Sequence, residues 1–226
     1  MAPQVTVLQL DTHFPRIKGD VGCLDSYVRA PQIIRVRGAS VDKIVSARPQ
    51  DVDITPFEEA LARATGDIIV TSCGFLSYWQ DYLAALTDRP FISSALTALG
   101  RLRHDYTPAQ LMILTFDADS LTAAHLGPHS SYTASISGLP PSHHLRHVIE
   151  QNLTVLDVHK ARTQLRDLIE RTQTPAHRHI LLECTNLPPY REMIKAVTGL
   201  PVTDILTRIE ATCPGSIAPQ VSRITP

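Results

Sequence analysis

An apolar segment that ends in a cysteine occurs twice in this chain, and this repeat constrains the fold more than any other feature of the sequence. Residues 69–73 align with residues 180–184 at an offset of 111 positions. Each of the two cysteines is followed after 17 positions by a proline, Pro90 or Pro201, and then by a second apolar segment. The order strand, cysteine, helix, proline, strand is therefore expected in both halves of the chain.

Short apolar segments alternate with amphipathic segments along the whole chain. Segments that are rich in Val, Ile and Leu and apolar throughout are typical of strands buried on both faces of a parallel sheet. An earlier pair of segments, 7–11 and 113–117, also matches, at an offset of 106 positions. The predicted strands are 5–10, 32–36, 67–71, 90–93, 110–115, 132–136, 179–182 and 201–205. The predicted helices are 56–64, 76–86, 95–104, 121–126, 144–152, 159–172, 190–197 and a last helix that begins near Leu206.

This alternation of strands and helices predicts an α/β fold built from βαβ units. Because the two halves are related, we expect two pseudo-symmetric parallel-sheet α/β subdomains with an interdomain cleft. Residues 1–95 plus 206–226 are assigned to the first subdomain, and residues 96–205 to the second. Parallel α/β sheets bind ligands beyond the carboxyl ends of their strands, so the cleft is the candidate site.

The composition narrows the class of protein. The chain has 226 residues, of which 43% are hydrophobic, and a net charge of -1. Binding of nucleic acid normally requires a basic excess, so we expect no nucleic-acid partner. No apolar run approaches the ~18–20 residues that span a bilayer. The first residues lack the pattern of a signal peptide. The four widely separated cysteines are typical of free thiols in a reducing compartment. We therefore expect a cytoplasmic protein with no membrane partner.

Cys73 and Cys184 are each expected at the carboxyl end of a strand, immediately before a helix. The N-terminus of a helix has unpaired N–H groups and a positive potential, which bind carboxylates and lower the pKa of a thiol. Two such thiols facing each other across a cleft can carry out a two-base proton transfer at the carbon α to a carboxylate. One removes a proton from one face of the substrate, and the other delivers a proton to the opposite face. The alternative interpretation, two small buried side chains at strand ends, stays open.

This chemistry needs no metal ion and no electron-sink cofactor, provided that N–H and hydroxyl donors stabilise the enolate. Ser72, Ser93 and Thr185 carry hydroxyls at predicted strand ends, and we expect them to bind substrate. The ten histidines lack a metal-binding pattern such as HExxH. The sequence contains neither GxGxxG nor GxSxG. We therefore predict no metal site and no cofactor.

Three motifs resemble one branch of the aspartate/glutamate racemase superfamily, and the resemblance covers nearly the whole chain. The motifs are LDTHFPR at 10–16, TSCGFL at 71–76 and ECTNLPPY at 183–190. The resemblance implies two α/β domains with pseudo-twofold symmetry and an active site in the cleft between them. It also implies that Cys73 and Cys184 are the acid/base pair, with Asp11 close by.

The sequence departs from the glutamate and aspartate racemases beside both cysteines, at positions that hold the substrate in that family. Those enzymes usually carry Asn-Thr after the first cysteine, where this chain has Gly74 and Phe75. They often carry Thr-His after the second cysteine, where this chain has Thr185 and Asn186. We still expect these residues to contact the substrate, in a pocket less polar than a glutamate site. Arg16 is the cation of the first motif and is predicted to bind a carboxylate; the alternative is an exposed side chain on a mobile loop.

Together these observations predict a cofactor-independent racemase or epimerase that acts at the carbon α to a carboxylate of an amino acid or related acid. A lyase or decarboxylase on the same scaffold is the first alternative, for example an enzyme similar to dimethylsulfoniopropionate lyase. Elimination and loss of CO₂ pass through a similar carbanion, so little else has to change. A catalytically silent ligand-binding protein is the second alternative. The expected partner is a small carboxylate, and a homo-oligomer stays open.

Overall fold

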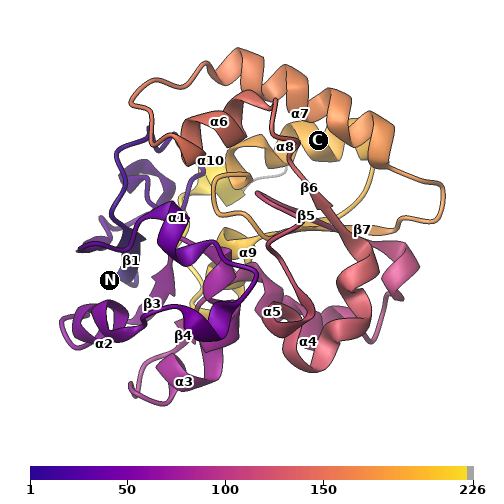
Figure 1. Cartoon of the computed structure of the whole chain (residues 1–226). Helices are drawn as coiled ribbons and strands as arrows, with labels where there is room; N and C mark the ends of the chain where they lie inside the picture. Colours follow the sequence, from indigo (N-terminus) through magenta and orange to yellow (C-terminus); the bar gives the residue numbers. More distant parts are fainter. Residues whose placement is uncertain (223–226) are drawn as a thin grey trace.

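Two four-stranded parallel sheets form the framework of the protein. The computed structural model describes residues 1–222 and places one sheet in each half of the chain (Figure 1). The first sheet has the strand order β2-β1-β3-β4, and the second has the order β6-β5-β7-β8. The strands are β1 (Val5–Leu10), β2 (Gln32–Val36), β3 (Ile68–Thr71), β4 (Phe91–Ile92), β5 (Leu111–Thr115), β6 (Ile136–Gly138), β7 (His179–Leu182) and β8 (Val202–Thr203).

The two sheets are related by the same offset as the sequence repeat. Ile69 of β3 pairs with Phe91 of β4, and 111 positions further on Ile180 of β7 pairs with Val202 of β8. In both sheets every strand pair is parallel. The equivalent strand order and register confirm the predicted α/β fold of two pseudo-symmetric parallel-sheet halves.

Helices connect the strands and cover the sheets. In the second half α7 and α8 pack against each other, and Figure 1 shows them side by side over the second sheet. The α-helices are α1 (Val41–Ile44), α2 (Thr55–Leu61), α3 (Gln80–Ala84), α4 (Leu99–Leu102), α5 (Ala123–Leu126), α6 (His144–Glu150), α7 (Val158–Thr172), α8 (Arg191–Thr198), α9 (Ile205–Thr212) and α10 (Pro219–Ser222). The 3₁₀ helices are η1 (Leu24–Ser26), η2 (Pro49–Asp51), η3 (Gly74–Trp79), η4 (Ala95–Ala98), η5 (Pro108–Gln110), η6 (Gly127–Ser135) and η7 (Pro188–Tyr190).

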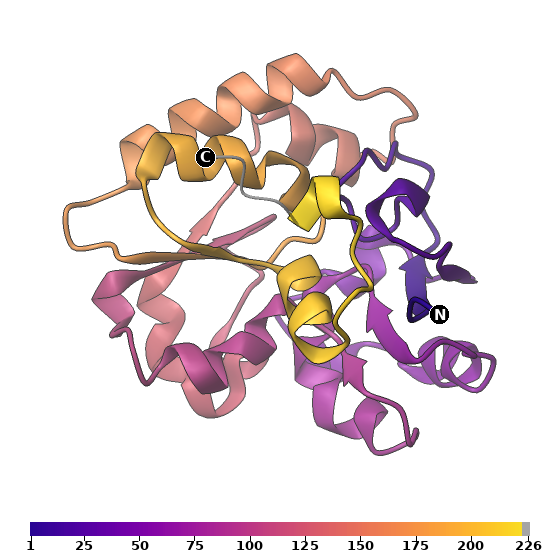
Figure 2. The same cartoon turned by 180° about the vertical axis from the view of Figure 1, so that it is seen from behind.

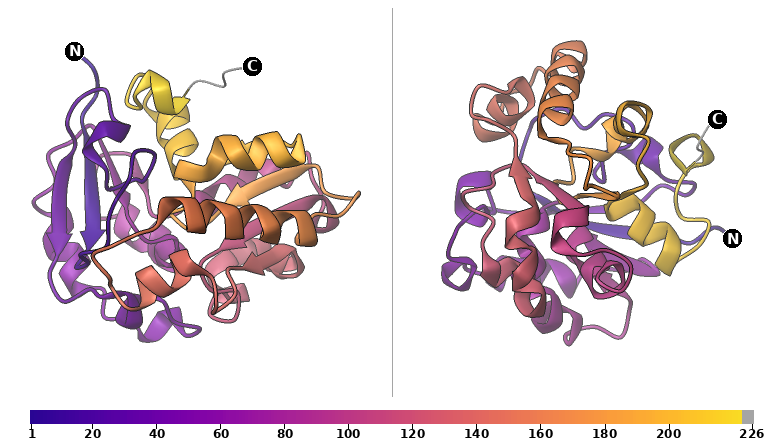
Figure 3. Two further views of the ribbon diagram at one scale, coloured as in Figure 1. Left: turned by 90° about the horizontal axis from the view of Figure 1, so that it is seen from above. Right: turned by 90° about the vertical axis from the view of Figure 1, so that its right-hand side faces the viewer.

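The chain returns to the first half after β8. Ile205, Leu206 and Ile209 of α9 are buried in one apolar cluster with residues of β1, β3 and β4. Val21, Tyr27 and Ile217 also belong to this cluster. Figure 2 shows α9 between the two halves, which lie side by side in Figure 3. A second, larger apolar cluster continues from the first half into the second. The proposed division at 95/96 and 205/206 stays a prediction.

A buried ion pair fixes the start of α9 against α8. Asp204 is the N-cap residue of α9, and its Oδ1 accepts a hydrogen bond from the N–H of Thr207 at 2.9 Å. The guanidinium of Arg191, the first residue of α8, donates to both carboxylate oxygens of Asp204, at 2.5 and 2.6 Å. Both residues are buried. Removal of either partner therefore leaves a charge inside the protein without compensation.

Most predicted elements are present, with bounds that differ by a few residues. The strand predicted at 132–136 is wrong over most of its length, because Gly127–Ser135 forms η6 and β6 begins only at Ile136. The ring of Tyr132 is buried there, and its hydroxyl donates to the carbonyl of Tyr106 at 2.5 Å. This tertiary contact holds the segment in a helical conformation that its β-favouring residues do not predict.

Candidate active site

The two cysteines lie at the carboxyl ends of equivalent strands. Cys73 follows β3 and is the N-cap residue of η3, while Cys184 follows β7 and precedes η7. The Sγ of Cys184 donates a hydrogen bond to the side-chain Oδ1 of Asn186, with 3.8 Å between the two atoms. Both cysteines are buried, with exposed fractions of 7% and 6%. Cys73 directly precedes its helix as expected, whereas residues 185–187 separate Cys184 from η7, so the helix expected immediately after Cys184 is not there. All four cysteines are free.

A small cavity between the halves connects the two cysteines. Its volume is about 30 Å³, which is enough for about two water molecules. Apolar side chains from both halves form much of the wall, among them Phe14, Phe75 and Phe116. The polar side chains in the wall are Ser72, Cys73, Glu183, Cys184, Thr185 and Asn186. Within residues 1–222, no lysine, arginine or histidine lines this cavity.

Direct contacts join the two cysteine-bearing segments across the boundary between the halves. The hydroxyl of Thr185 donates to the backbone carbonyl of Ser72 at 2.7 Å. The position equivalent to Thr185 in the first half is Gly74, where a Cβ would overlap the Oε1 and the backbone carbonyl of Glu183. Gly74 is therefore required by a close approach of the second half, not by a turn.

Glu183 is a functional candidate that the sequence reasoning missed. Its side chain is completely buried beside Cys184, and its Oε2 accepts a hydrogen bond from the hydroxyl of Thr115 at 2.6 Å. Its Oε1 has no hydrogen-bond partner among residues 1–222. The sequence does contain a signal for Glu183: the repeat aligns it with Ser72, at the end of a fully apolar strand. Glutamate is almost never fully buried without a reason, so this position could have been singled out.

Burial dominates the ionisation of the cavity. Burial, and secondly the negative charge of Glu183, raise the pKa of the Cys73 thiol to about 12. The same two causes, in the same order, raise the pKa of Cys184 well above its ordinary value. Burial also raises the pKa of Glu183 to about 7, although its hydrogen bond from Thr115 lowers it. Burial therefore shifts all three groups toward their neutral forms, whereas the sequence led us to expect a lowered thiol pKa, and the carboxyl is the first to lose its proton as the pH rises.

The structure brings seven of the predicted site residues together in the cavity wall, namely Ser72, Cys73, Gly74, Phe75, Cys184, Thr185 and Asn186. Asp11, Arg16 and Ser93 do not line it. The carboxylate of Asp11 instead accepts from the N–H of Gly38 at 3.1 Å and lies 3.7 Å from Arg35. The hydroxyl of Ser93 donates to Gln80 at 2.8 Å.

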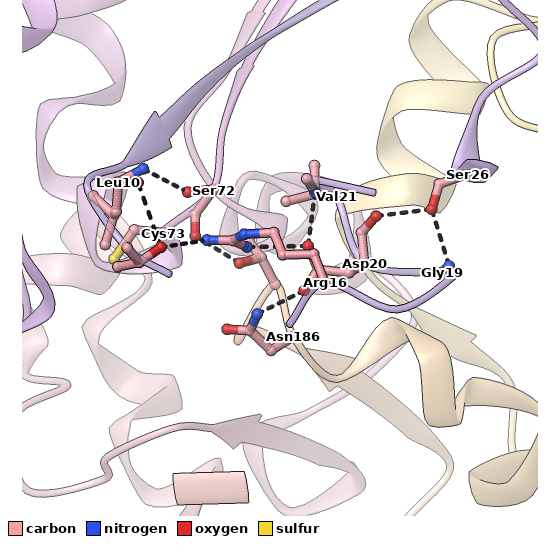
Figure 4. A network of polar contacts seen from close by, with 12 residues as sticks. Leu10, Arg16, Gly19, Asp20, Val21, Ser26, Ser72, Cys73 and Asn186 are labelled. Atoms are coloured by element: carbon pink, nitrogen blue, oxygen red, sulfur yellow. Dashed lines mark hydrogen bonds and ion pairs between the residues drawn. The ribbon is translucent and has the colours of Figure 1, made fainter. Parts of the chain in front are cut away.

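The side chain of Arg16 is 8% exposed and is held by residues of its own loop. Its guanidinium donates to Oδ1 of Asp20 at 3.0 Å and to the hydroxyl of Thr12 at 3.2 Å, and it lies over the ring of Phe14. Asp20 in turn accepts from the amide of Asn186 at 2.6 Å, so this pair is linked to the cavity wall (Figure 4). The positive charge of Arg16 lowers the pKa of Cys73. This effect is smaller than those of burial, of Glu183 and of the backbone of Phe75 on the same thiol. Its geometry gives no direct support to the predicted role as a carboxylate clamp.

Residues 1–222 contain no group of three or more His, Cys, Asp or Glu side chains arranged to hold a metal ion. Within that range no helix is both long and apolar enough to cross a membrane.

Solved structures define the class of fold. Allantoin racemase from Pseudomonas fluorescens aligns with 99% of this chain and 97% of its own, with a TM-score of 0.57 and 10% identity. Unliganded arylmalonate decarboxylase aligns with 89% of this chain and 86% of its own, with a TM-score of 0.53 and 13% identity. Aspartate racemase from Picrophilus torridus aligns with 97% of this chain and 98% of its own, with a TM-score of 0.52 and 11% identity. The protein has the fold of the aspartate/glutamate racemase superfamily.

One relative in sequence is named for a different activity from those of the three solved structures. A dimethylsulfoniopropionate lyase from Durusdinium sp. clade D is 27% identical over 222 residues, which cover 88% of this chain and 70% of the lyase. No protein-family model matches the sequence. The fold and this relative together indicate an enzyme.

Proposed function

We propose that this protein is an enzyme that moves protons at the carbon α to a carboxylate, with Cys73 and Cys184 as the acid/base pair. The observation that carries the proposal is the cavity that both thiols line from opposite halves of the molecule. A thiolate takes the proton, so that the Cα–H bond breaks and an enolate forms. In a racemase or epimerase, the second thiol then donates its proton to the opposite face of the carbon.

The wall of the cavity supports this chemistry. Hydrogen bonding by the backbone of Phe75 and of Asn186 lowers the pKa of Cys73 and of Cys184, respectively, which favours a thiolate when it forms. The same wall excludes bulk water, so that fixed dipoles act on the enolate in a medium of low dielectric constant. The cavity of about 30 Å³ must widen before an organic acid enters. Movement of one half relative to the other provides that widening, since both halves contribute to the wall.

A lyase is the second candidate, because two specific observations favour it. One is the relative whose name is dimethylsulfoniopropionate lyase. The other is the wall itself, in which Phe14, Phe75 and Phe116 provide the aromatic surface that favours a sulfonium cation. In this reaction a thiolate removes the proton from the carbon α to the carboxylate, and the carbon–sulfur bond at the β carbon breaks. Dimethyl sulfide and acrylate are then the products.

Incubation in D₂O separates these candidates. We expect one of a small set of acids (aspartate, glutamate, a phenylmalonate and dimethylsulfoniopropionate) to react. Deuterium at Cα with inversion, followed by ¹H NMR and chiral chromatography, identifies a racemase. Dimethyl sulfide in the headspace identifies a lyase, and release of CO₂ identifies a decarboxylase. If the folded protein exchanges or cleaves none of these acids, the proposal is wrong.

Cysteine variants test the assignment of the acid/base pair. Cys73→Ser and Cys184→Ser should each lower kcat by at least about 100-fold, the usual effect of losing a positioned acid or base. Cys213→Ser is the matched control, since this residue is only partly buried and lies outside the cavity. A variant of Cys73 or Cys184 that keeps near-normal turnover would remove that residue from the mechanism.

A further inference from the structure

The carboxyl of Glu183 occupies a position that the pseudo-symmetry of the protein does not repeat. The repeat aligns Glu183 with Ser72 and Gly74 with Thr185. On one side of the boundary the Thr185 side chain contacts the backbone of the first half. On the other side Gly74 has no side chain, and the carboxyl of Glu183 occupies the space that a Cβ would fill. Glu183 thus reaches from the strand of Cys184 to the segment of Cys73.

One oxygen of this carboxyl is packed beside Gly74 and has no hydrogen-bond partner among the described residues. The hydroxyl of Thr115 on β5 holds Oε2, whereas Oε1 is buried, has no hydrogen-bond partner within residues 1–222, and belongs to a residue of the cavity wall. A buried polar atom without a hydrogen-bond partner destabilises the folded protein. A ligand that pairs with Oε1 recovers this free energy when it binds.

The charged groups around the cavity determine whether Glu183 is protonated when a ligand binds. The ionisable groups that face it are the thiols of Cys73 and Cys184. Of the Arg16–Asp20 pair beside them, Arg16 lowers the pKa of Cys73 and Asp20 raises the pKa of Cys184. The proposed reaction brings a carboxylate substrate and a thiolate into a wall that contains no cation. An ionised Glu183 would add a third negative charge to the same small space, which Coulomb repulsion at low dielectric constant disfavours.

We propose that Glu183 binds substrate as a neutral carboxylic acid, whose Oε1–H donates a hydrogen bond to the carboxylate of the substrate. This inference rests on the proposed function, because it specifies how that site holds an anionic acid. The donated hydrogen bond strengthens as the enolate forms, since negative charge then accumulates on the oxygens of the substrate. A neutral Glu183 also no longer opposes formation of a thiolate at either cysteine.

Binding of propionate, a small acid that undergoes neither elimination nor decarboxylation, tests this inference by calorimetry. Between about pH 7 and pH 9 the association constant of the wild-type protein should fall about tenfold per pH unit, because one proton must be taken up with the anion. Titrations at pH 8 in phosphate and in Tris should report uptake of one proton, and titrations at pH 6 should report none.

Two variants separate a hydrogen-bond donor from a mere space-filling side chain. Glu183→Gln keeps an N–H donor at the same place but has no proton to lose, so it should bind propionate with no pH dependence and no proton uptake. Glu183→Met has a similar size and no donor, so it should lose binding at every pH. Glu192→Gln, at an exposed ion pair with Lys195, is the control and should behave as the wild type does.

The opposite pH dependence would overturn the inference. If Glu183 instead binds a cationic group of the substrate, propionate will not bind at any pH, or its binding will strengthen as the pH rises. Wild-type behaviour of Glu183→Gln would be equally decisive against it. Propionate binding does not require turnover, so failure of this inference leaves the cysteine chemistry untouched. Failure of the D₂O experiment likewise leaves the binding result interpretable.

Discussion

Glu183→Gln should make the protein more stable in alkaline solution, and by an amount that follows from the structure. Burial raises the pKa of Glu183 from 4.5 to about 7. The folded state therefore holds a proton that the unfolded state releases, and the native state loses stability as the pH rises from 4.5 through about 7. At about 1.4 kcal/mol per pH unit, this difference amounts to about 3 kcal/mol. The amide variant is neutral in both states and does not pay this penalty.

Urea unfolding at a series of pH values measures the effect. Below pH 4.5 the two proteins should have similar free energies of unfolding, because the carboxyl is protonated whether the chain is folded or not. Above pH 8 the variant should exceed the wild type by about 3 kcal/mol. Glu192→Gln should show no such pH-dependent gain, since its carboxylate is half-exposed and pairs with Lys195.

Parallel stability curves for Glu183→Gln and the wild type would refute this reasoning. They would mean that the carboxyl of Glu183 ionises in the folded protein as easily as in the unfolded chain. A cation or several ordered waters would then have to stabilise the carboxylate inside the cavity. A gain that appears already below pH 4.5 would instead indicate a change in packing rather than in protonation.

Three further substitutions test contacts described above, each by urea unfolding. Gly74→Ala should lose about 1–3 kcal/mol, because the new methyl group overlaps Glu183, whereas Gly100→Ala, inside α4 and with room for a Cβ, should gain stability; equal effects would contradict the close approach. Thr185→Val should lose about 1–2 kcal/mol with its buried hydrogen bond, and Thr185→Ser should not. Arg191→Met should lose about 3–5 kcal/mol, because it leaves the buried charge of Asp204 without its cation; a loss below about 1 kcal/mol would show that water reaches that carboxylate.

The fold was predictable because strands buried on both faces leave a continuous apolar signal, and because the signal occurs twice. The spacing between each cysteine and its proline fixed the connection from β3 to β4 and from β7 to β8. The segment at 132–136 failed because its β-favouring residues are held in η6 by a long-range contact of Tyr132. Such contacts depend on where other segments lie, and local sequence does not contain that information.

The site was predictable only where the backbone alone determines position. Cys73 and Cys184 lie at strand ends, so the topology places them in one cavity. Arg16 forms an ion pair with Asp20 inside an irregular loop, where no periodicity of the sequence predicts the pairing. Asp11 lies at the predicted strand end, but its carboxylate turns toward Gly38 and Arg35. Side-chain packing determines which of several nearby groups Arg16 and Asp11 contact, and the motif at 10–16 does not specify that packing.

The return of α9 to the first sheet affects how this chain folds while it is being synthesised. The strands of the first sheet are complete once β4 has been made, yet the apolar surface that Ile205, Leu206 and Ile209 cover remains open until α9 emerges. About 110 residues separate β4 from α9, and at ~5–20 residues per second their translation takes roughly 6–20 s. During that time the nascent amino-terminal half exposes this apolar surface on the ribosome. Such an exposed apolar surface is a target for chaperones.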